Sequence, residues 1–442
     1  MTEGKVKNMY TDFVYPNYDE EWDEKAPVIT PNCVRWSNLN IINHHIYQGK
    51  KNNFDNYKLL FAGAGLGNDL IFAALQLKTY KNIKIVAIDL SPSSLEILQK
   101  RLKLYNIENV EVREMSLLDL TPETFGKFDF INCIGVLHHL QNPSDGLKAL
   151  NSVLEDDGFM DIMVYGKIGR TGIYQMQDLL RKVNKDVGEL DYDEKLKRYR
   201  LIYNKLPQFN WFKKSEFLAP DHLTMGDNGV IDMLLHHQDR AYTIHELYDW
   251  VEEENLNIVN FHVLNRSKLE SEIEGIEFKT KREQYEFNEL FHGDLIKHQF
   301  FLSKKTETVA SLEDLDNILQ INYITRGEWD SLIKKLEELG HSYPSPELTF
   351  TCSYYLFNNS DKLLDSGRKM QIKFKSDFVM TRLLKLIDGK TKTKRLFTKV
   401  REELNVDLSN EEMLERFRPI YEAFNLHDAL LLKRDDRVLS FN

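Results

Sequence analysis

The chain has 442 residues, which is enough for two or three domains, and its 42% of hydrophobic residues allows sizeable cores. Its net charge of −11 argues against a nucleic-acid binder that works through bulk charge. Cys33, Cys133 and Cys352 lie far apart without metal-binding or paired spacing, and no apolar run reaches the roughly 20 residues of a membrane span, so we expect a cytoplasmic protein.

Short β-like runs alternate with amphipathic helices from Lys58 onward. The predicted strands are 58–62, 83–88, 109–114, 128–134 and 159–165. The predicted helices are 68–78, 92–104 and 143–154, and prolines at the start of the last two are typical of a first helical turn. This alternation predicts an α/β fold with a parallel sheet, which binds its ligands at the carboxyl ends of the strands.

The alternation breaks at 168–238, which reads as mostly helical, and then resumes. A helix is predicted over 243–254, with Thr243 and Glu246 as a capping box, followed by strands at 257–264 and 298–303. We therefore expect one sheet domain over 51–304, with a helical insertion at 168–238 and a second insertion at 265–296.

The segments on either side of this domain differ from it. Residues 305–442 contain predicted helices at 375–387, 391–404 and 410–424 and then two short apolar runs around "KRDDR", which suggests a winged-helix-like C-terminal domain. Residues 1–50 form an N-terminal arm. Its Tyr10 and Tyr15 fit a lid over a ligand and fit a simple packing arm equally well.

The stretch "FAGAGLGNDL" places Gly63, Gly65 and Gly67 directly after the first strand. A dinucleotide-binding turn needs its third glycine, or an alanine, where this chain has Asn68. The turn therefore favours a ligand without a pyrophosphate, and S-adenosylmethionine (SAM) is the candidate. A tight connection without a ligand stays open as the alternative.

Asp89 closes the second strand in "IVAIDLSPSSL". A carboxylate there can accept two hydrogen bonds from ribose hydroxyls. It can also merely cap the helix that follows, although the glycine turn upstream favours the ligand.

The segment "CIGVLHHLQNP" after the fourth strand, "LKALNSVLEDDGFMDIMVYG" and "HHQDRAYTIHELYDWVEEENLNIVNF" resemble class I SAM-dependent methyltransferases over 58–165 and 239–303. The resemblance implies a Rossmann-like sheet, SAM as cofactor and S-adenosylhomocysteine as product. It also implies a set of cofactor-binding residues: Gly63, Ala64, Gly65, Gly67, Asp69, Asp89, Leu90, Ser116, Leu117 and Gly135. Many relatives carry an aspartate at the position of Ser116.

A narrower resemblance involves "INHHIYQG", "VYGKIGRTGIYQMQDLLR" and "LLKLIDGKTKTKRLFTKV". These segments resemble a bacterial group that includes protein-lysine methyltransferases of outer-membrane proteins and that carries added middle and C-terminal domains. The group is functionally mixed.

The catalytic candidates are His138 and His139, which would lie beside the methyl group, although a histidine at a helix start is as often structural. Tyr165, Arg170 and Tyr174 follow the fifth strand and are candidates for substrate binding, with Tyr10 and Tyr15. No metal is expected, because the adjacent histidine pairs His44-His45 and His236-His237 lack the spacing of a metal helix.

Three functions remain open. The first is methylation of a protein amine, lysine in particular, which the insertion and the extra domain favour. The second is methylation of a small metabolite or peptide, and the third is a scaffold without catalysis. The expected partner is a protein or peptide substrate, and the insertion and C-terminal domain also offer surface for a homodimer.

Overall fold

In a computed structural model, the chain is described over residues 2–16, 23, 38–189, 191–322, 324–339, 347–357 and 363–435. It forms two compact units. The first comprises residues 1–25, 56–71 and 82–305, and the second comprises 26–55, 72–81 and 306–442. Part of the predicted N-terminal arm (17–22 and 24–37, with Cys33) lies outside the described residues, as does the predicted apolar run at 438–441.

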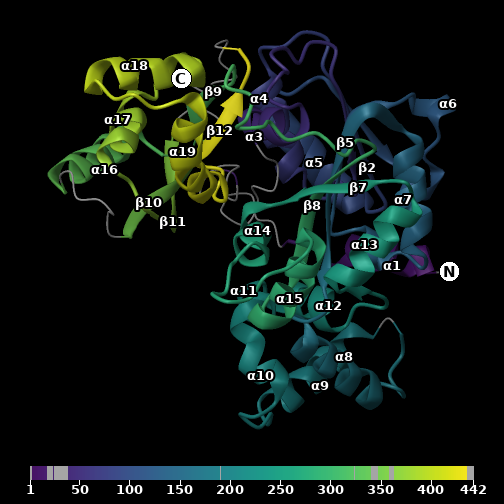
Figure 1. The fold of residues 1–442 in the computed structure, drawn as a ribbon. Helices are drawn as coiled ribbons and strands as arrows, with labels where there is room; N and C mark the ends of the chain where they lie inside the picture. The colour runs from purple at the N-terminus through teal and green to yellow at the C-terminus, as the bar shows by residue number, and fades with distance from the viewer. Residues whose placement is uncertain are drawn as a thin grey trace. The chain divides into compact units, whose positions relative to one another are not determined.

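An eight-stranded sheet forms the centre of the first unit, with the order β3-β2-β1-β4-β5-β8-β7 and β6 paired to β5 (Figure 1). The strands are β1 (Lys58–Ala62), β2 (Lys84–Asp89), β3 (Val110–Glu114), β4 (Phe128–Ile134), β5 (Leu154–Gly166), β6 (Ala241–Tyr242), β7 (Asn257–Phe261) and β8 (Lys297–Ser303). Pairing is parallel except at β8, which is antiparallel to both of its neighbours. The order reverses between β1 and β4, where open α/β sheets bind their ligands. The predicted Rossmann-like sheet is confirmed.

Helices on both faces explain why the central strands are continuous apolar runs. Leu59, Leu60 and Phe61 of β1 are each at most 2% exposed. The helices between strands are α4 (Asn68–Leu77), α5 (Pro92–Leu104), α6 (Pro122–Phe125), α7 (Pro143–Ser152) and α13 (Ile244–Glu253). Because parallel crossovers are right-handed, the reversal at β1 puts α7 on the face opposite α4 and α5. Leu147 of α7 and Trp250 of α13 share a core with the strands.

Three predicted boundaries were wrong. The helix predicted to end at 154 ends at Ser152, because Leu154 already begins β5 and pairs with Phe128. This strand therefore starts earlier than the predicted residue 159, and a register shift after Phe128 accommodates its acidic start. The strand predicted to reach 264 ends at Phe261, because α14 (Val263–Leu269) begins two residues later.

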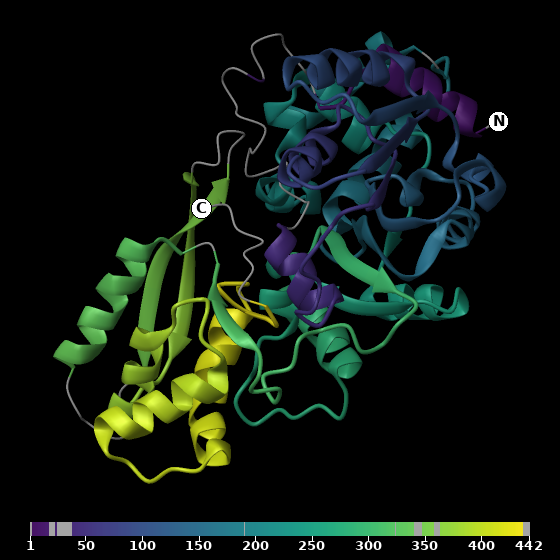
Figure 2. The same cartoon turned by 90° about the horizontal axis from the view of Figure 1, so that it is seen from above.

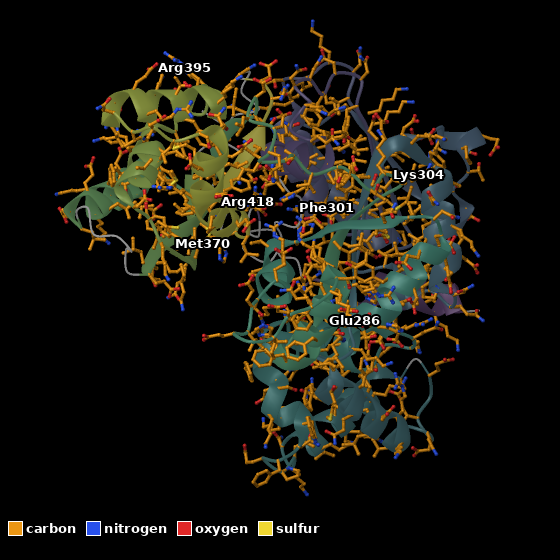
Figure 3. All side chains as sticks on the ribbon, viewed as in Figure 1. Glu286, Phe301, Lys304, Met370, Arg395 and Arg418 are labelled. Carbon is orange, nitrogen blue, oxygen red and sulfur yellow. The ribbon has the colours of Figure 1, made fainter. Side chains whose placement is uncertain are left out.

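Strand β8 lies between β5 and β7 in this sheet, and Figure 3 labels Phe301 in it and Lys304 just after it. Phe301 lies inside the sheet, and its ring contacts that of Phe159 on β5 at 5.8 Å. Just after the strand, Lys304 donates a hydrogen bond of 2.9 Å to the carbonyl oxygen of Leu154. The ring of Phe301 and the side chain of Lys304 thus hold the antiparallel strand β8 against β5.

The region between β5 and β6 is helical, as predicted, and its helices lie together below the sheet in the view of Figure 1. They are α8 (Thr171–Val183), α9 (Tyr192–Tyr203), α10 (Trp211–Ser215), α11 (Asp221–Thr224) and α12 (Gly226–Leu234). The N-terminal helix α1 (Thr2–Asp12) contributes Met9 to their apolar core. A further helix, α15 (Lys281–His292), fills the predicted second insertion.

The second unit contains two small antiparallel sheets and several helices (Figure 2). Its elements are α3 (Leu39–Ile46), β9 (Ile318–Ile321), α16 (Arg326–Glu338), β10 (Leu348–Phe357), β11 (Leu363–Phe374), α17 (Phe378–Leu386), α18 (Thr393–Leu404), α19 (Asn410–Asn425) and β12 (Leu430–Lys433). The last three helices lie where three helices were predicted, but α17 begins at Phe378 and not at 375, because Asp377 caps it, and α18 begins at Thr393 and not at 391. The first of the two predicted apolar runs forms β12, which pairs with β9 from much earlier in the chain. The winged-helix class stays a prediction.

Candidate active site

The glycine turn after β1 is tied to the end of β2. The backbone N–H groups of Gly63 and Ala64 both donate to the carbonyl oxygen of Ile88, at 2.8 and 3.0 Å. Gly63, Gly65 and Gly67 all have positive φ angles (77°, 52° and 76°), a backbone conformation that residues other than glycine rarely adopt. The turn therefore requires glycine for its backbone shape alone.

The space around the three glycines differs. A Cβ atom on Gly63 would lie 2.2 Å from Cγ2 of Val136, and one on Gly67 would lie 2.2 Å from Cδ1 of Leu98. A Cβ atom on Gly65 would meet no heavy atom within 4 Å. The protein's own packing thus excludes side chains at the outer two positions, whereas the middle glycine faces open space where a ligand can approach the backbone.

Asp89 connects this open side with the end of β2. Its Oδ2 accepts a hydrogen bond of 2.8 Å from Gly65 N, and its Oδ1 accepts one of 2.9 Å from Ser91 N. Burial raises the pKa of Asp89, and these backbone N–H groups oppose the rise. The cap of α5 comes from Ser91, whose side chain accepts from Ser94 N, so the carboxylate is not that helix's cap. Each carboxylate oxygen keeps a lone pair for a ligand hydroxyl.

The other predicted cofactor residues surround this point or continue the turn. Met115 N donates to the carbonyl oxygen of Asp89 at 3.0 Å, which brings the segment after β3 beside it. Ser116 then caps the short helix Leu117–Asp119, and Leu117 is buried in the core. Gly135 ends β4 with φ of 79°. The remaining two are Leu90, directly after β2, and Asp69, in the first turn of α4, where a helix favours a negative charge.

A second group of polar side chains gathers where β4 and β5 end. This buried polar cluster consists of Tyr10, His138, His139, Tyr165, Arg170, Tyr174, Asp232, His236 and Asp239. It unites segments far apart in sequence: α1, the short helix Leu137–His139, the end of β5, the start of α8, α12 and the loop before β6. The structure thus brings nearly all the predicted catalytic and substrate residues together. Tyr15 lies next to the cluster and donates a hydrogen bond of 3.0 Å to Asp221.

Stacked rings form the centre of the buried polar cluster. The guanidinium carbon of Arg170 lies 3.5 Å from the ring centroid of Tyr165, close enough for a cation–π contact. The ring of His138 lies against the same tyrosine, with centroids 3.8 Å apart. His139 stacks on His236 at 3.9 Å. A positively charged group thus lies among aromatic faces.

The N-terminal helix adds Tyr10, which contacts both halves of the site: the cofactor half around Gly65 and Asp89, and the buried polar cluster. The hydroxyl of Tyr10 donates a hydrogen bond of 2.6 Å to Oδ1 of Asp232, and its ring lies 5.9 Å from that of His236. Its backbone carbonyl accepts a hydrogen bond of 3.0 Å from the hydroxyl of Ser91, two residues after Asp89. Helix α1 therefore fits the lid that the sequence suggested, and it also packs in the core of the insertion.

Protonation in the cluster is set mainly by burial. Burial lowers the pKa of His139 to about 4, so its ring is neutral near pH 7, and Nδ1 lies 3.0 Å from the carbonyl oxygen of Gln238, to which it donates. Burial likewise raises the pKa of Asp232 to about 6, against the opposing effects of the Tyr10 hydrogen bond and the Arg170 charge. Burial favours neutral Arg170, but the nearby tyrosines and carboxylates outweigh it and raise the pKa.

Several buried polar atoms of the cluster make no hydrogen bond within the described part of the chain. They are Nε and Nη2 of Arg170, Nε2 of His236 and Oδ1 of Asp239. Nη2 of Arg170 does lie 3.8 Å from Oδ2 of Asp239, as an ion pair. Leaving a buried polar group without a partner costs about 1–3 kcal/mol. Such a concentration is typical of a place that binds a polar ligand or water.

Sequence reasoning missed Asp232, and it considered His236 only as half of a metal pair. Asp232 stands in "GVIDML", where nothing marks it as different from a polar residue on an amphipathic helix. Asp239 was quoted within the resemblance but received no role. Their partners, Tyr10 and Arg170, lie at distant points of the chain, so no local signal was available.

The fold and the glycine–aspartate arrangement together define the class of this domain. The strand order with an antiparallel β8, the turn with three glycines and the acid at the end of β2 are those of class I SAM-dependent methyltransferases. The chain carries such a domain, and SAM is its cofactor. Gly65 and Asp89 fit the adenosine part of SAM, because the turn is open and the carboxylate keeps free lone pairs.

Comparisons with known proteins agree with this class. Residues 60–160 match a family described as a methyltransferase domain. An uncharacterized protein of Synechococcus sp. is 29% identical over 272 residues, 59% of this chain and 64% of its own length. A ubiquinone biosynthesis O-methyltransferase of Acinetobacter baumannii is 24% identical over 74 residues, 17% of this chain and 31% of its own. This chain's matches thus span less than two thirds of these relatives.

One solved structure shares most of the fold. PKMT2 from Rickettsia typhi, in complex with AdoHcy, aligns with a TM-score of 0.56 over 86% of this chain and 71% of its own, at 16% identity. At this identity the similarity concerns the fold.

Among the described residues, no helix is long and apolar enough to cross a membrane.

Proposed function

We propose that this protein transfers a methyl group from SAM to an amine of a protein, and that the acceptor amine is a lysine side chain. The observation that carries the proposal is the buried polar cluster at the carboxyl ends of β4 and β5. Tyrosine faces attract an ammonium group through cation–π contacts, and a carboxylate attracts it by charge. Tyr10 and Asp232 supply both features next to the cofactor half of the site.

In this proposal the cofactor half holds SAM and aligns it. Asp89 binds the ribose hydroxyls, the Gly65 turn lies along the ligand, and Ser116 and Leu117 lie at the adenine. When bound, SAM supplies a methyl group on a positively charged sulfur, which is already activated for displacement. The protein therefore contributes chiefly alignment, and effective alignment alone can lower a barrier by about 7–11 kcal/mol.

An amine acceptor reacts only in its neutral form, so the site must take a proton from it. Burial disfavours a charged ammonium, and the positive charge of Arg170 disfavours it further. The orphaned Nε and Nη2 of Arg170 and Oδ1 of Asp239 are available to polar groups that accompany the amine. His139 is neutral near pH 7, so it positions groups without adding charge.

A macromolecular acceptor agrees with the size of the chain around the site. The helical insertion contributes Tyr174, Asp232 and His236 to the cluster, and it also exposes large apolar side chains that a protein partner can cover. These are Leu201, Phe209, Trp211, Phe217 and Leu223. The name PKMT2 indicates protein lysine methylation for the Rickettsia protein, whose fold this chain shares.

The test is methyl transfer in a lysate. Purified protein with isotopically labelled SAM is added to a bacterial lysate that keeps its small molecules, and the labelled proteins are hydrolysed and analysed for methylated amino acids by mass spectrometry. We expect methyllysine, and we expect much less of it at the same SAM concentration with the Asp89→Ala variant as the control. Label confined to small molecules would contradict a protein acceptor.

The second candidate is a methyltransferase for a small metabolite or peptide. The depth of the cluster favours it, because His138 and Arg170 are at most 5% exposed and a small acceptor is more easily enclosed. The similarity to ubiquinone biosynthesis O-methyltransferases points the same way over a short segment. The small-molecule fraction of the same lysate, analysed for label, distinguishes the two.

A further inference from the structure

We propose that Asp232 is the carboxylate that binds the acceptor's ammonium group and removes its proton, and that Tyr10 is the residue that positions it. This inference rests on the proposed amine acceptor. It assigns the base that the sequence did not identify, and it places that base on the insertion, outside the sheet that holds the cofactor.

Asp232 is a buried carboxylate that is held by a tyrosine. It lies on α12 with 8% of its surface exposed, and its Oδ1 accepts the hydrogen bond from Tyr10 at 2.6 Å. No described lysine or arginine forms an ion pair within 4 Å of it. A buried carboxylate without a paired cation is costly and therefore rare. A cationic ligand would supply the missing charge.

The other charged and titratable groups around Asp232 come from several elements. Arg170 precedes α8, Asp221 lies on α11, Asp239 lies in the loop before β6, and Tyr10 lies on α1. Tyr15 and Tyr165 also interact with its charge. The two other carboxylates repel its charge and Arg170 attracts it. Burial raises the pKa of Asp232 by more than the Tyr10 hydrogen bond and the Arg170 charge lower it. Asp232 therefore has a higher affinity for a proton than an exposed aspartate.

The proton transfer is balanced without any other reactant. An N–H bond of the acceptor ammonium breaks, its electron pair stays on nitrogen as the lone pair, and the proton forms an O–H bond with the carboxylate of Asp232. The nitrogen is then a nucleophile, and the carboxylic acid returns its proton to solvent after product release. A base whose pKa lies nearer the working pH is better matched to this task.

Tyr10 gives the base a fixed position relative to the cofactor. Its hydroxyl holds Asp232, and its carbonyl oxygen is held by Ser91 beside the ribose-binding Asp89. Through one residue, the N-terminal helix thus fixes the distance between the two halves of the site. Tyr10 acts through Asp232 and is a positioning residue.

The experiment compares methyllysine formation by three variants in the labelled lysate, with rates measured from pH 5 to 9. Asp232→Asn keeps the shape of the side chain, and we expect kcat/KM to fall by about 10²–10⁴-fold, the usual contribution of a general base. The rise of the wild-type rate through about pH 6 should disappear. Tyr10→Phe removes a hydrogen bond that lowers the pKa of Asp232, so its rise should move to higher pH.

The matched control is Asp227→Asn, the same change on the same helix, where the carboxylate pairs with Arg200 at the surface and should leave rates unchanged. Calorimetric SAM binding, measured on all variants, should stay within about twofold of wild type and shows that each is folded. Wild-type rates and pH profile in Asp232→Asn would overturn the inference alone. Label on a group other than an amine would overturn the proposed function as well.

Discussion

Replacing Asp232 by asparagine should make the protein more stable at pH 8, although it removes the proposed base. The native carboxyl group is buried beside Asp221 and Asp239, so its ionised form is disfavoured, and its pKa is raised to about 6 from the ordinary 3.8. A neutral amide of the same shape avoids this cost, and its oxygen can still accept the hydrogen bond from Tyr10.

The size of the effect follows from the shift of about two pKa units, each worth about 1.4 kcal/mol. Between about pH 4 and 6 the folded protein keeps a proton on Asp232 that the unfolded chain has lost, so the free energy of unfolding falls as the pH rises. Above this window the whole cost, on the order of 3 kcal/mol, is present, and below it the cost is absent. The variant should therefore gain on the wild type as the pH rises.

Urea denaturation of both proteins at pH 4.5, 6 and 8 measures this difference. His139, whose pKa is lowered to about 4, destabilises the fold as the pH falls below about 6.5, but it does so in both proteins and cancels in the difference. A variant that is less stable than the wild type at pH 8, or a difference that does not change with pH, would refute the reasoning that the native carboxylate is ionised at a cost.

Three further outcomes are expected. Gly65→Ala strains a residue with φ of 52° by about 1–2 kcal/mol, but its Cβ meets no atom, so the variant should fold and bind SAM at least about tenfold more weakly. Gly63→Ala should lose more stability, because its Cβ meets Val136. Wild-type SAM affinity of Gly65→Ala in calorimetry would contradict this reasoning. Asp89→Ala should weaken SAM binding by about 1–3 kcal/mol for each lost hydrogen bond, and unchanged affinity would refute the ribose contact. Deleting 306–442 removes β12, against which the apolar face of α3 packs, so light scattering should detect aggregation, and a monodisperse truncated protein would show that α3 is stable without it.

The sheet could be predicted, and a cofactor site could be proposed at the ends of β1 and β2, because the signals for both are local. The glycine turn needs its residues at adjacent positions, and Asp89 ends the strand that pairs directly with β1. Periodicity located every strand from β1 to β4 within one residue at either end. The errors arose where two signals overlap, as at Leu154, which continues the apolar spacing of a helix but pairs with Phe128.

The second unit was harder to predict for a topological reason. The sequence predicts β12 only as an apolar run beside the polar turn "KRDDR", and the second run of that pair lies outside the described residues. The partner of β12 is β9, which precedes α16 and the whole β10–β11 hairpin. Pairing between such distant segments depends on which edges the rest of the fold leaves open, and a single sequence carries no record of that.

The acceptor half of the site shows the same limit at the level of single residues. Arg170 and Tyr165 could be suggested because they follow a predicted strand, at the edge where α/β sheets bind ligands. Asp232 could not, because its meaning comes from Tyr10, more than two hundred positions away, and from burial that an amphipathic helix does not reveal. The residues proposed to bind the cofactor thus lie in one continuous stretch, 63–135, whereas those proposed to bind the acceptor come from the sheet domain, helix α1 and the insertion. Under the proposed function, a change in helix α1 or the insertion would alter the acceptor while leaving the sheet as it is.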